Sequence, residues 1–326
     1  MLGATAFSYK LYNMKQKLIT GIAVFLFGLL GVSAQQDPQY TQYMYNTQVV
    51  NPGYAGSKEV LSFGALMRSQ WVGLDGAPKT GTFTIDGPVS SAKNMGLGLS
   101  IVVDEIGPAV ETNFTVDYSY TIKVGEDKNV AFGLKAGMHI LDVDFTKLDV
   151  FDQNDPRFQN NIDNKFQPQI GAGLYFHTPN YYVGLSVPNF LTTRHFDVSS
   201  LDNSNSESTP QENVHYFLIA GYVFDVNENL KLKPAFMSKV VAGAPLQADV
   251  SLNALFNEKL TLGVAYRWSA AVTAMAGFQV NDGLFIGLGY DYQTTDLEIY
   301  SDGSYELMLR FDVFTKPERV LTPRFF

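Results

Sequence analysis

The stretch Leu260-Thr261-Leu262-Gly263-Val264-Ala265-Tyr266-Arg267-Trp268 decides the fold. Large apolar side chains occupy every second position, and the positions between them hold threonine, glycine, alanine and arginine. A period of two places alternate side chains on opposite faces of a β-strand. One face is therefore apolar and the other is small or charged. This pattern is typical of a transmembrane β-barrel, whose outer face meets lipid and whose inner face is wet.

The same alternation recurs from residue 58 onward and predicts an all-β transmembrane outer-membrane β-barrel of about fourteen antiparallel strands. Most segments reach the roughly 9–11 residues that a tilted strand needs to cross a bilayer. Single-chain bacterial barrels have an even number of strands. The strands are expected at 58–71, 79–87, 95–104, 110–123, 129–142, 166–177, 180–187, 213–225, 229–240, 246–256, 259–268, 271–281, 283–293 and 302–314.

The joints between these segments give the orientation. Two joints are long, at 143–165 and 188–213, and they follow the fifth and seventh expected strands. Most joints after even-numbered strands are tight turns. Outer-membrane barrels keep short turns in the periplasm and long loops outside. The sequence therefore predicts a protein of the cell outer membrane with both termini in the periplasm.

Four parts of the chain are expected. Residues 1–34 are read as an extended start plus a cleaved signal peptide, because a basic stretch precedes the apolar run 18–30 and small residues follow it. Residues 35–57 are an N-terminal periplasmic or plug segment, 58–314 the barrel, and 315–326 a C-terminal periplasmic tail. The segment 35–57 is too short to fold alone and is expected to dock into or under the barrel mouth. Its aromatic and apolar side chains, which would make the contact, are Tyr40, Tyr43, Met44 and Tyr45.

Charge and composition exclude several classes of function. The formal net charge is −9, and removal of the signal peptide would make it more negative. Nucleic-acid binding needs a basic face, so no nucleic acid is expected as a partner. Cysteine is absent, which leaves no disulfide framework and no thiolate chemistry. A soluble β-sandwich or propeller is the alternative fold, but it would not need an apolar band on every strand.

Alternation also assigns the faces of the strands. Charge on the lipid face costs about 2–4 kcal/mol per Arg or Lys at the bilayer midplane, so charged strand residues are expected to face the lumen. These polar lumen residues include Lys135, His139, Arg267, Asp291, Glu306 and Arg310, with Asp117 and Asp312 on the same face. An interfacial aromatic girdle is expected from Tyr181, Tyr182, Tyr222, Trp268, Tyr290 and Tyr292.

A series of short motifs in a fixed order resembles the PorP/SprF family of the type IX secretion system, found in Bacteroidetes. The motifs are QDPQYTQYMYN (36–46), VNPGYAG (50–56), RSQWVGLDGAP (68–78), DEIGP (104–108), GLSVPN (184–189), LKP (232–234) and GAPLQ (243–247). They cover essentially the whole mature chain. Tyr305 departs from the family pattern, which has a histidine there.

The resemblance implies a barrel that works in protein export and surface attachment. PorP-like members are core components linked to the periplasmic secretion machinery. SprF-like members are partners of individual secreted cargo proteins with a type B C-terminal domain, such as gliding adhesins. Both branches stay open, with the SprF-like branch favoured because its paralogues are numerous. Outer-membrane lipid is a further expected partner.

Two groups of residues are candidates for partner binding. The N-terminal motif supplies Asp37, Pro38, Gln39, Tyr40, Gln42, Tyr43, Met44, Tyr45, Asn51 and Pro52. The outer rim supplies Arg68, Trp71, Asp75 and Pro78. Tryptophan at the rim has a composition favoured at binding hot spots, although a membrane-interface role for Trp71 fits equally well.

No enzyme, cofactor or metal site is expected. A barrel hydrolase would need a histidine beside a serine and an acid; His177 and Ser186 lie on neighbouring expected strands, but no carboxylate is placed with them. The predicted function is therefore to bind a secreted surface protein and help to export or anchor it. Two rivals remain: a transport barrel for a small hydrophobic solute, and a core scaffold tied to periplasmic machinery.

Overall fold

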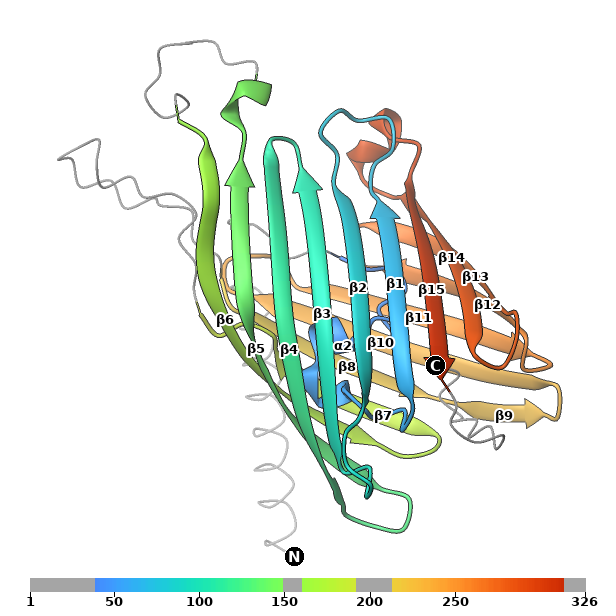
Figure 1. Cartoon of the computed structure of the whole chain (residues 1–326). Helices are drawn as coiled ribbons and strands as arrows, with labels where there is room; N and C mark the ends of the chain where they lie inside the picture. Colours follow the sequence, from blue (N-terminus) through green and yellow to red (C-terminus); the bar gives the residue numbers. More distant parts are fainter. Residues whose placement is uncertain (1–38, 149–159, 192–212, 314–326) are drawn as a thin grey trace, which may run out of the picture.

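The computed structural model describes residues 39–148, 160–191 and 213–313. Most of these residues belong to one antiparallel sheet (Figure 1). Its strands are β1 Leu61–Ser69, β2 Lys79–Pro88, β3 Met95–Ile106, β4 Ala109–Lys123, β5 Asn129–Val143, β6 Ile162–His177, β7 Tyr181–Val187, β8 His215–Tyr222, β9 Phe224–Asn227, β10 Leu230–Val241, β11 Gln247–Phe256, β12 Leu260–Arg267, β13 Ala271–Gln279, β14 Leu284–Gln293 and β15 Ser304–Val313.

The sheet closes on itself. β1 pairs with β2 on one side and with β15 on the other, and in the latter pair Leu61 lies opposite Val313 and Ser69 opposite Tyr305. β8 and β9 are two parts of one wall position, because both pair with β10 and are separated only by the buried Val223. The structure is thus a closed barrel of fourteen strands, as the sequence predicts. Closure pairs the sheet edges that an open sheet would leave exposed.

Side chains alternate around the barrel as expected. On β12, Leu262 and Val264 are exposed on the outer face, whereas Thr261 and Arg267 are buried in the lumen. The outer face therefore forms the apolar band that a lipid environment requires. One girdle prediction is wrong: Tyr182 is only 5% exposed and lies inside. Its neighbour Tyr181 stacks on Tyr222, and adjacent positions on a strand point to opposite faces.

Short helical turns complete the described structure. They are α2 Thr47–Val50, η1 Pro52–Tyr54, η2 Phe145–Lys147 and η5 Asp296–Tyr300. None of the helices in the described residues is long and apolar enough to cross a membrane. β1 begins and β15 ends at the lower end of the barrel in Figure 1, and the loop from β1 to β2 lies at the upper end. β5 also ends at the upper end, so the joint after Val143 begins there, whereas β7 ends at Val187, opposite Ala172 within the β6 wall.

Candidate functional site

The lumen holds part of the chain itself. We call residues 39–58 the inner segment; α2 and η1 belong to it and lie inside the ring of strands (Figure 1). Every residue from Tyr40 to Lys58 is buried except Val49, which is half-buried. Of the predicted partner-binding residues, Asp37 and Pro38 lie outside the described residues. Gln39, Tyr40, Gln42, Tyr43, Met44, Tyr45, Asn51 and Pro52 all lie in the inner segment.

The inner segment is compact because its own turns use its backbone groups. The amide of Tyr45 donates to the carbonyl of Gln42 over 2.9 Å, and the amide of Asn51 donates to that of Thr47 over 2.8 Å. The side chain of Asn51 then accepts from the amide of Gly53 over 2.9 Å and so caps η1. Buried backbone groups without partners are costly. These turns therefore make a non-strand segment compatible with a closed interior.

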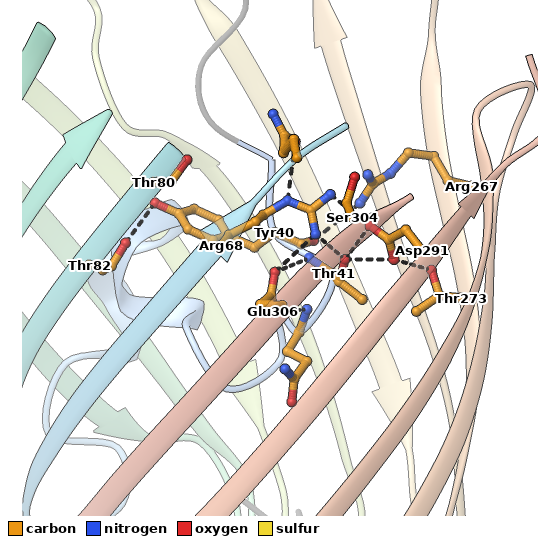
Figure 2. A network of polar contacts seen from close by, with 12 residues as sticks. Tyr40, Thr41, Arg68, Thr80, Thr82, Arg267, Thr273, Asp291, Ser304 and Glu306 are labelled. Carbon is orange, nitrogen blue, oxygen red and sulfur yellow. Dashed lines mark hydrogen bonds and ion pairs between the residues drawn. The ribbon is translucent and has the colours of Figure 1, made fainter. Parts of the chain in front are cut away.

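A buried charged network fixes the upper part of the inner segment (Figure 2). Arg68 lies 2.6 Å from Asp291 and 3.3 Å from Glu306. Both oxygens of Glu306 accept backbone amides of the segment, from Thr41 over 2.9 Å and from Gln42 over 2.7 Å. The hydroxyl of Thr41 donates to Asp291 over 2.7 Å. We call Arg68, Asp291, Glu306 and Thr41 the Arg68 network.

A second ion pair lies beside the first. Arg267 pairs with Asp249 over 2.9 Å and also donates to the carbonyl of Tyr40 over 3.2 Å. The hydroxyl of Tyr40 lies 3.0 Å from that of Thr82 on β2 (Figure 2). Buried charges are tolerated when they are paired and hydrogen-bonded. The wall thus uses its lumen charges to hold this segment in one position.

Hydrogen bonds to other walls hold the middle of the inner segment. Ser186 on β7 donates to the carbonyl of Val50 over 2.6 Å, and Ser119 on β4 donates to that of Ala55 over 2.6 Å. Gln48 donates to Asp117 over 3.2 Å, and Lys135 lies 3.1 Å from the same carboxylate. The segment therefore touches walls all around the ring and spans the lumen.

Glycines in the wall make room for the backbone of the inner segment. A Cβ atom added to Gly133 on β5 would lie 2.1 Å from the nitrogen of Gly53. One added to Gly96 on β3 would lie 2.1 Å from the carbonyl oxygen of Ala55. Neither distance is possible between non-bonded atoms, so these wall positions require glycine for the observed contact.

Aromatic packing and Lys58 hold the lower part. Tyr45 packs on Phe285 with ring centroids 4.7 Å apart, and the Arg310 guanidinium lies 5.7 Å from the Tyr45 ring. Lys58 lies 3.3 Å from Asp312 and is buried. Burial lowers the pKa of Lys58 from 10.5 to about 8, and the positive charge of Arg310 acts in the same direction. Burial also raises the pKa values of Tyr43 and Tyr45.

The lowered pKa of Lys58 predicts a pH dependence of stability. Between pH 8 and pH 10.5 the folded chain has a neutral Lys58 while the unfolded chain still carries the charge. The unfolded state binds more protons in this window, so the free energy of unfolding should rise with pH, by roughly 1–3 kcal/mol. Urea unfolding at pH 7.5 and pH 9.5 measures the rise, which Lys58→Met should abolish. The upper pH stays below the ordinary tyrosine pKa of about 10, because above it the raised pKa values of Tyr43 and Tyr45 would lower the stability. Lys93→Met is the control, because Lys93 is exposed. Equal rises in wild type and Lys58→Met would contradict the prediction.

The predicted lumen residues and rim residues differ in their placement. Lys135, His139, Arg267, Asp291, Glu306 and Arg310 are all buried on the inner face. Arg68 was expected at the outer rim but lies inside, with only 4% of its surface exposed. Trp71 is half-buried with a positive φ of 45°, Asp75 is exposed and Pro78 is buried. Sequence reasoning missed Asp249, although alternation along 246–256 puts it on the inner face with Ser251 and Asn253.

Within the described residues, no group of three or more His, Cys, Asp or Glu side chains could hold a metal ion. The charged side chains of the upper lumen form ion pairs with one another and hydrogen bonds with the inner segment. The arrangement is that of a membrane β-barrel whose interior is occupied by its own chain.

The comparison with protein families agrees with this class. The family model described as type IX secretion system membrane protein PorP/SprF matches residues 32–311. The chain therefore belongs to the PorP/SprF family. It is an outer-membrane β-barrel protein of the type IX secretion system.

Curated proteins give no match to this chain. Among solved structures, it is similar to the outer membrane protein Omp33 of Acinetobacter baumannii, with 10% identity, 78% of this chain and 100% of that chain covered, and a TM-score of 0.46. It is similar to the Ralstonia pickettii toluene transporter TbuX, with 12% identity, 80% of this chain and 91% of that chain covered, and a TM-score of 0.44. It is also similar to a Pseudomonas aeruginosa FadL homologue, with 11% identity, 85% of this chain and 95% of that chain covered, and a TM-score of 0.41.

Proposed function

We propose that this barrel binds a secreted cargo protein with a type B C-terminal domain at its outer rim and helps to export or anchor that protein at the cell surface. The family supports an association with the secretion machinery. The observation that carries the proposal is the occupied lumen: the inner segment spans it and is buried except at Gln39 and Val49, which are half-buried. Binding at the rim needs no passage through the barrel.

The chemistry of the lumen weighs against the first rival, transport of a small hydrophobic solute. Such a solute needs a continuous apolar path. The upper lumen instead contains the Arg68 network and the Arg267–Asp249 pair. In this conformation the inner segment closes the path further, which makes it a plug of the barrel.

The same burial weighs against the second rival, a scaffold that contacts periplasmic machinery through residues 35–57. Residues 40–57 bury their side chains against the barrel wall. They are not free to bind a second protein while the plug is in place. A scaffold role would have to use another surface.

Hydrogen bonds join three loops at the upper end, namely residues 70–78, the turn at Gly107 and residues 301–303. We call these loops the platform. The amide of Val72 donates to the carbonyl of Gly303 over 2.9 Å, and the amide of Asp302 donates to that of Val72 over 2.7 Å. The amide of Gly107 donates to the carbonyl of Gly76 over 2.9 Å. The loop at 70–78 is thus fixed on both sides. A pre-organised surface loses less entropy on binding than a free loop does, which suits a partner site.

A matched pair of tryptophan variants tests the proposal. Trp71 is in the platform, and Trp268, the chain's other tryptophan, follows β12 at the same end of the barrel. Trp71→Ala should reduce cargo recovery at least about tenfold, since hot-spot truncation costs about 2 kcal/mol or more. Trp268→Ala should leave it unchanged. The measurement is affinity purification of tagged protein from its own outer membrane, with quantitative mass spectrometry of the bound proteins.

The outcomes separate the rivals. A large surface protein with a type B C-terminal domain, lost only in Trp71→Ala, supports the proposal. Recovery of periplasmic machinery alone would favour the scaffold. A barrel that brings no partner would refute both and favour solute transport.

A further inference from the structure

A groove of about 800 Å³ runs along the outer wall where the barrel closes between β15 and β1. The strand register places one lipid-facing row across its floor. Leu288 lies opposite Leu307, Leu307 opposite Met67, and Met67 opposite Gly81. The row thus runs over four strands, and Gly81 leaves a gap because a Cβ added there would meet nothing within 4 Å. The volume lies in the range of sites for small ligands.

The next lipid-facing row, two residues higher on each strand, has different chemistry. It runs through Tyr290, Tyr305, Ser69, Lys79 and Glu105, each lying opposite the next. The rings of Tyr290 and Tyr305 have centroids 5.1 Å apart. Lys79 is exposed and has no ion pair in the described part of the chain. The upper edge of the groove is therefore aromatic and polar.

A second hollow, of about 470 Å³, lies directly above and shares the two tyrosines. Besides Tyr290 and Tyr305 it is lined by Tyr292, Gln293, Glu298 and Asp302. The hydroxyl of Tyr292 donates to the carboxylate of Glu298, and that of Tyr290 donates to the carbonyl of Asp302 over 3.3 Å. We call the lower space the wall groove and the upper one the rim hollow.

From the lower to the upper end, the lining changes from apolar side chains to the two shared tyrosines and then to the carboxylates of Glu298 and Asp302 and the amide of Gln293. This sequence of groups matches a ligand with an apolar part and a hydroxyl-rich head. We propose that the wall groove and the rim hollow together bind one glycolipid of the outer leaflet, with acyl chains in the groove and a sugar head in the hollow. Carboxylates and amides hydrogen-bond well to hydroxyl groups. Tyrosine rings offer an apolar face and a polar edge, as an interfacial sugar requires.

Position and charge both favour a glycolipid over other occupants. The groove lies at the upper end of the wall, beside the loops at 70–78 and 301–303, so it faces the outer leaflet. The residues that line the rim hollow include two carboxylates and no Lys or Arg, which disfavours a headgroup that consists only of phosphate. Lys79 at the junction suits an acidic group where sugar and acyl chains meet.

Native mass spectrometry tests this binding. The full-length protein is placed in phosphatidylcholine nanodiscs that contain rough lipopolysaccharide or, separately, phosphatidylethanolamine. Wild type should retain one lipopolysaccharide molecule, saturably and in preference to phosphatidylethanolamine. Ala276→Phe places a ring in the wall groove beside Leu288. It should weaken retention at least about tenfold, because the acyl chains lose their apolar contacts in the groove. Gly81→Leu should do the same.

A matched variant controls for general effects of a larger lipid-facing side chain. Ala136 on β5 is also exposed on the outer face, away from the groove. Ala136→Phe should leave retention unchanged. Tyr290→Leu keeps the groove apolar and should remove the preference for lipopolysaccharide over phosphatidylethanolamine.

Three results would overturn the proposal. Equal retention of both lipids by wild type would mean an ordinary annular lipid surface. Unchanged binding in both Ala276→Phe and Gly81→Leu would exclude the groove. Recovery of a dimer that Ala276→Phe disrupts would assign the groove to a second copy of the chain. Heat-modifiable migration on gels confirms that each variant is folded.

Discussion

Arg68→Ala is expected to lower the free energy of unfolding by about 3–5 kcal/mol, because it leaves buried charges without their partner. Asp291 and Glu306 both contact this guanidinium, and neither carboxylate can reach bulk water. Urea unfolding of the purified barrel measures the loss. The upper part of the inner segment should also become sensitive to protease, since its amides bind Glu306.

An exposed ion pair provides the control for this variant. Lys93 lies 3.0 Å from Glu59, and about half of each side chain is exposed. Such pairs contribute about 0–1 kcal/mol, so Lys93→Ala should change stability little. A loss below about 1 kcal/mol in Arg68→Ala would show that water compensates the lumen charges, and that the network is not what holds the segment.

Gly133→Val is expected to displace the inner segment and open the lumen. Even the Cβ atom of the new side chain would lie 2.1 Å from the nitrogen of Gly53. Overpacking of this kind typically costs about 1–3 kcal/mol, and here the least costly relief is to move the segment rather than a strand that is hydrogen-bonded on both sides. Wild type should give little current in planar lipid bilayers, and the variant a steady conductance.

Gly81→Val is the matched control, because Gly81 faces outward and has open space around it. It should conduct no more than wild type. A closed Gly133→Val barrel that retains wild-type stability would argue against this contact as a determinant of the plug's position. Stable conductance in wild type would show that the inner segment leaves a water-filled path.

Most of the wall could be predicted from alternation. Along a strand between lipid and a polar lumen, apolar and polar residues alternate, so each position shows which face it occupies. The alternation in Leu260–Trp268 is enough to place Arg267 inside and Trp268 outside. The prediction weakens where a strand leaves the membrane. β6 begins at Ile162 rather than at 166, since residues above the bilayer need not alternate. The break at Val223 between β8 and β9 has no signal in the pattern.

The site was only partly predictable, for a different physical reason. Alternation from Ser62 through Gly64 and Leu66 puts Arg68 on the inner face, but the motif around Trp71 suggested the rim instead. The contacts of Thr41 could not be foreseen at all. Its partners Asp291 and Glu306 are 250 and 265 residues away, and no periodicity links a turn to strands so distant.

Because of those long separations, we expect the upper contacts of the inner segment to form in the last stage of folding. The inner segment precedes β1, yet its upper contacts are completed by β14 and β15, the final strands of the barrel. Loop-closure entropy delays such non-local contacts, which slows folding. Arg68 on β1 and Glu306 on β15 lie opposite each other across the closing seam. Seam closure therefore brings together the two side chains that bind Thr41: Arg68 donates to its hydroxyl, and Glu306 accepts its backbone amide. A barrel that closes without the inner segment leaves Glu306 without the amides of Thr41 and Gln42.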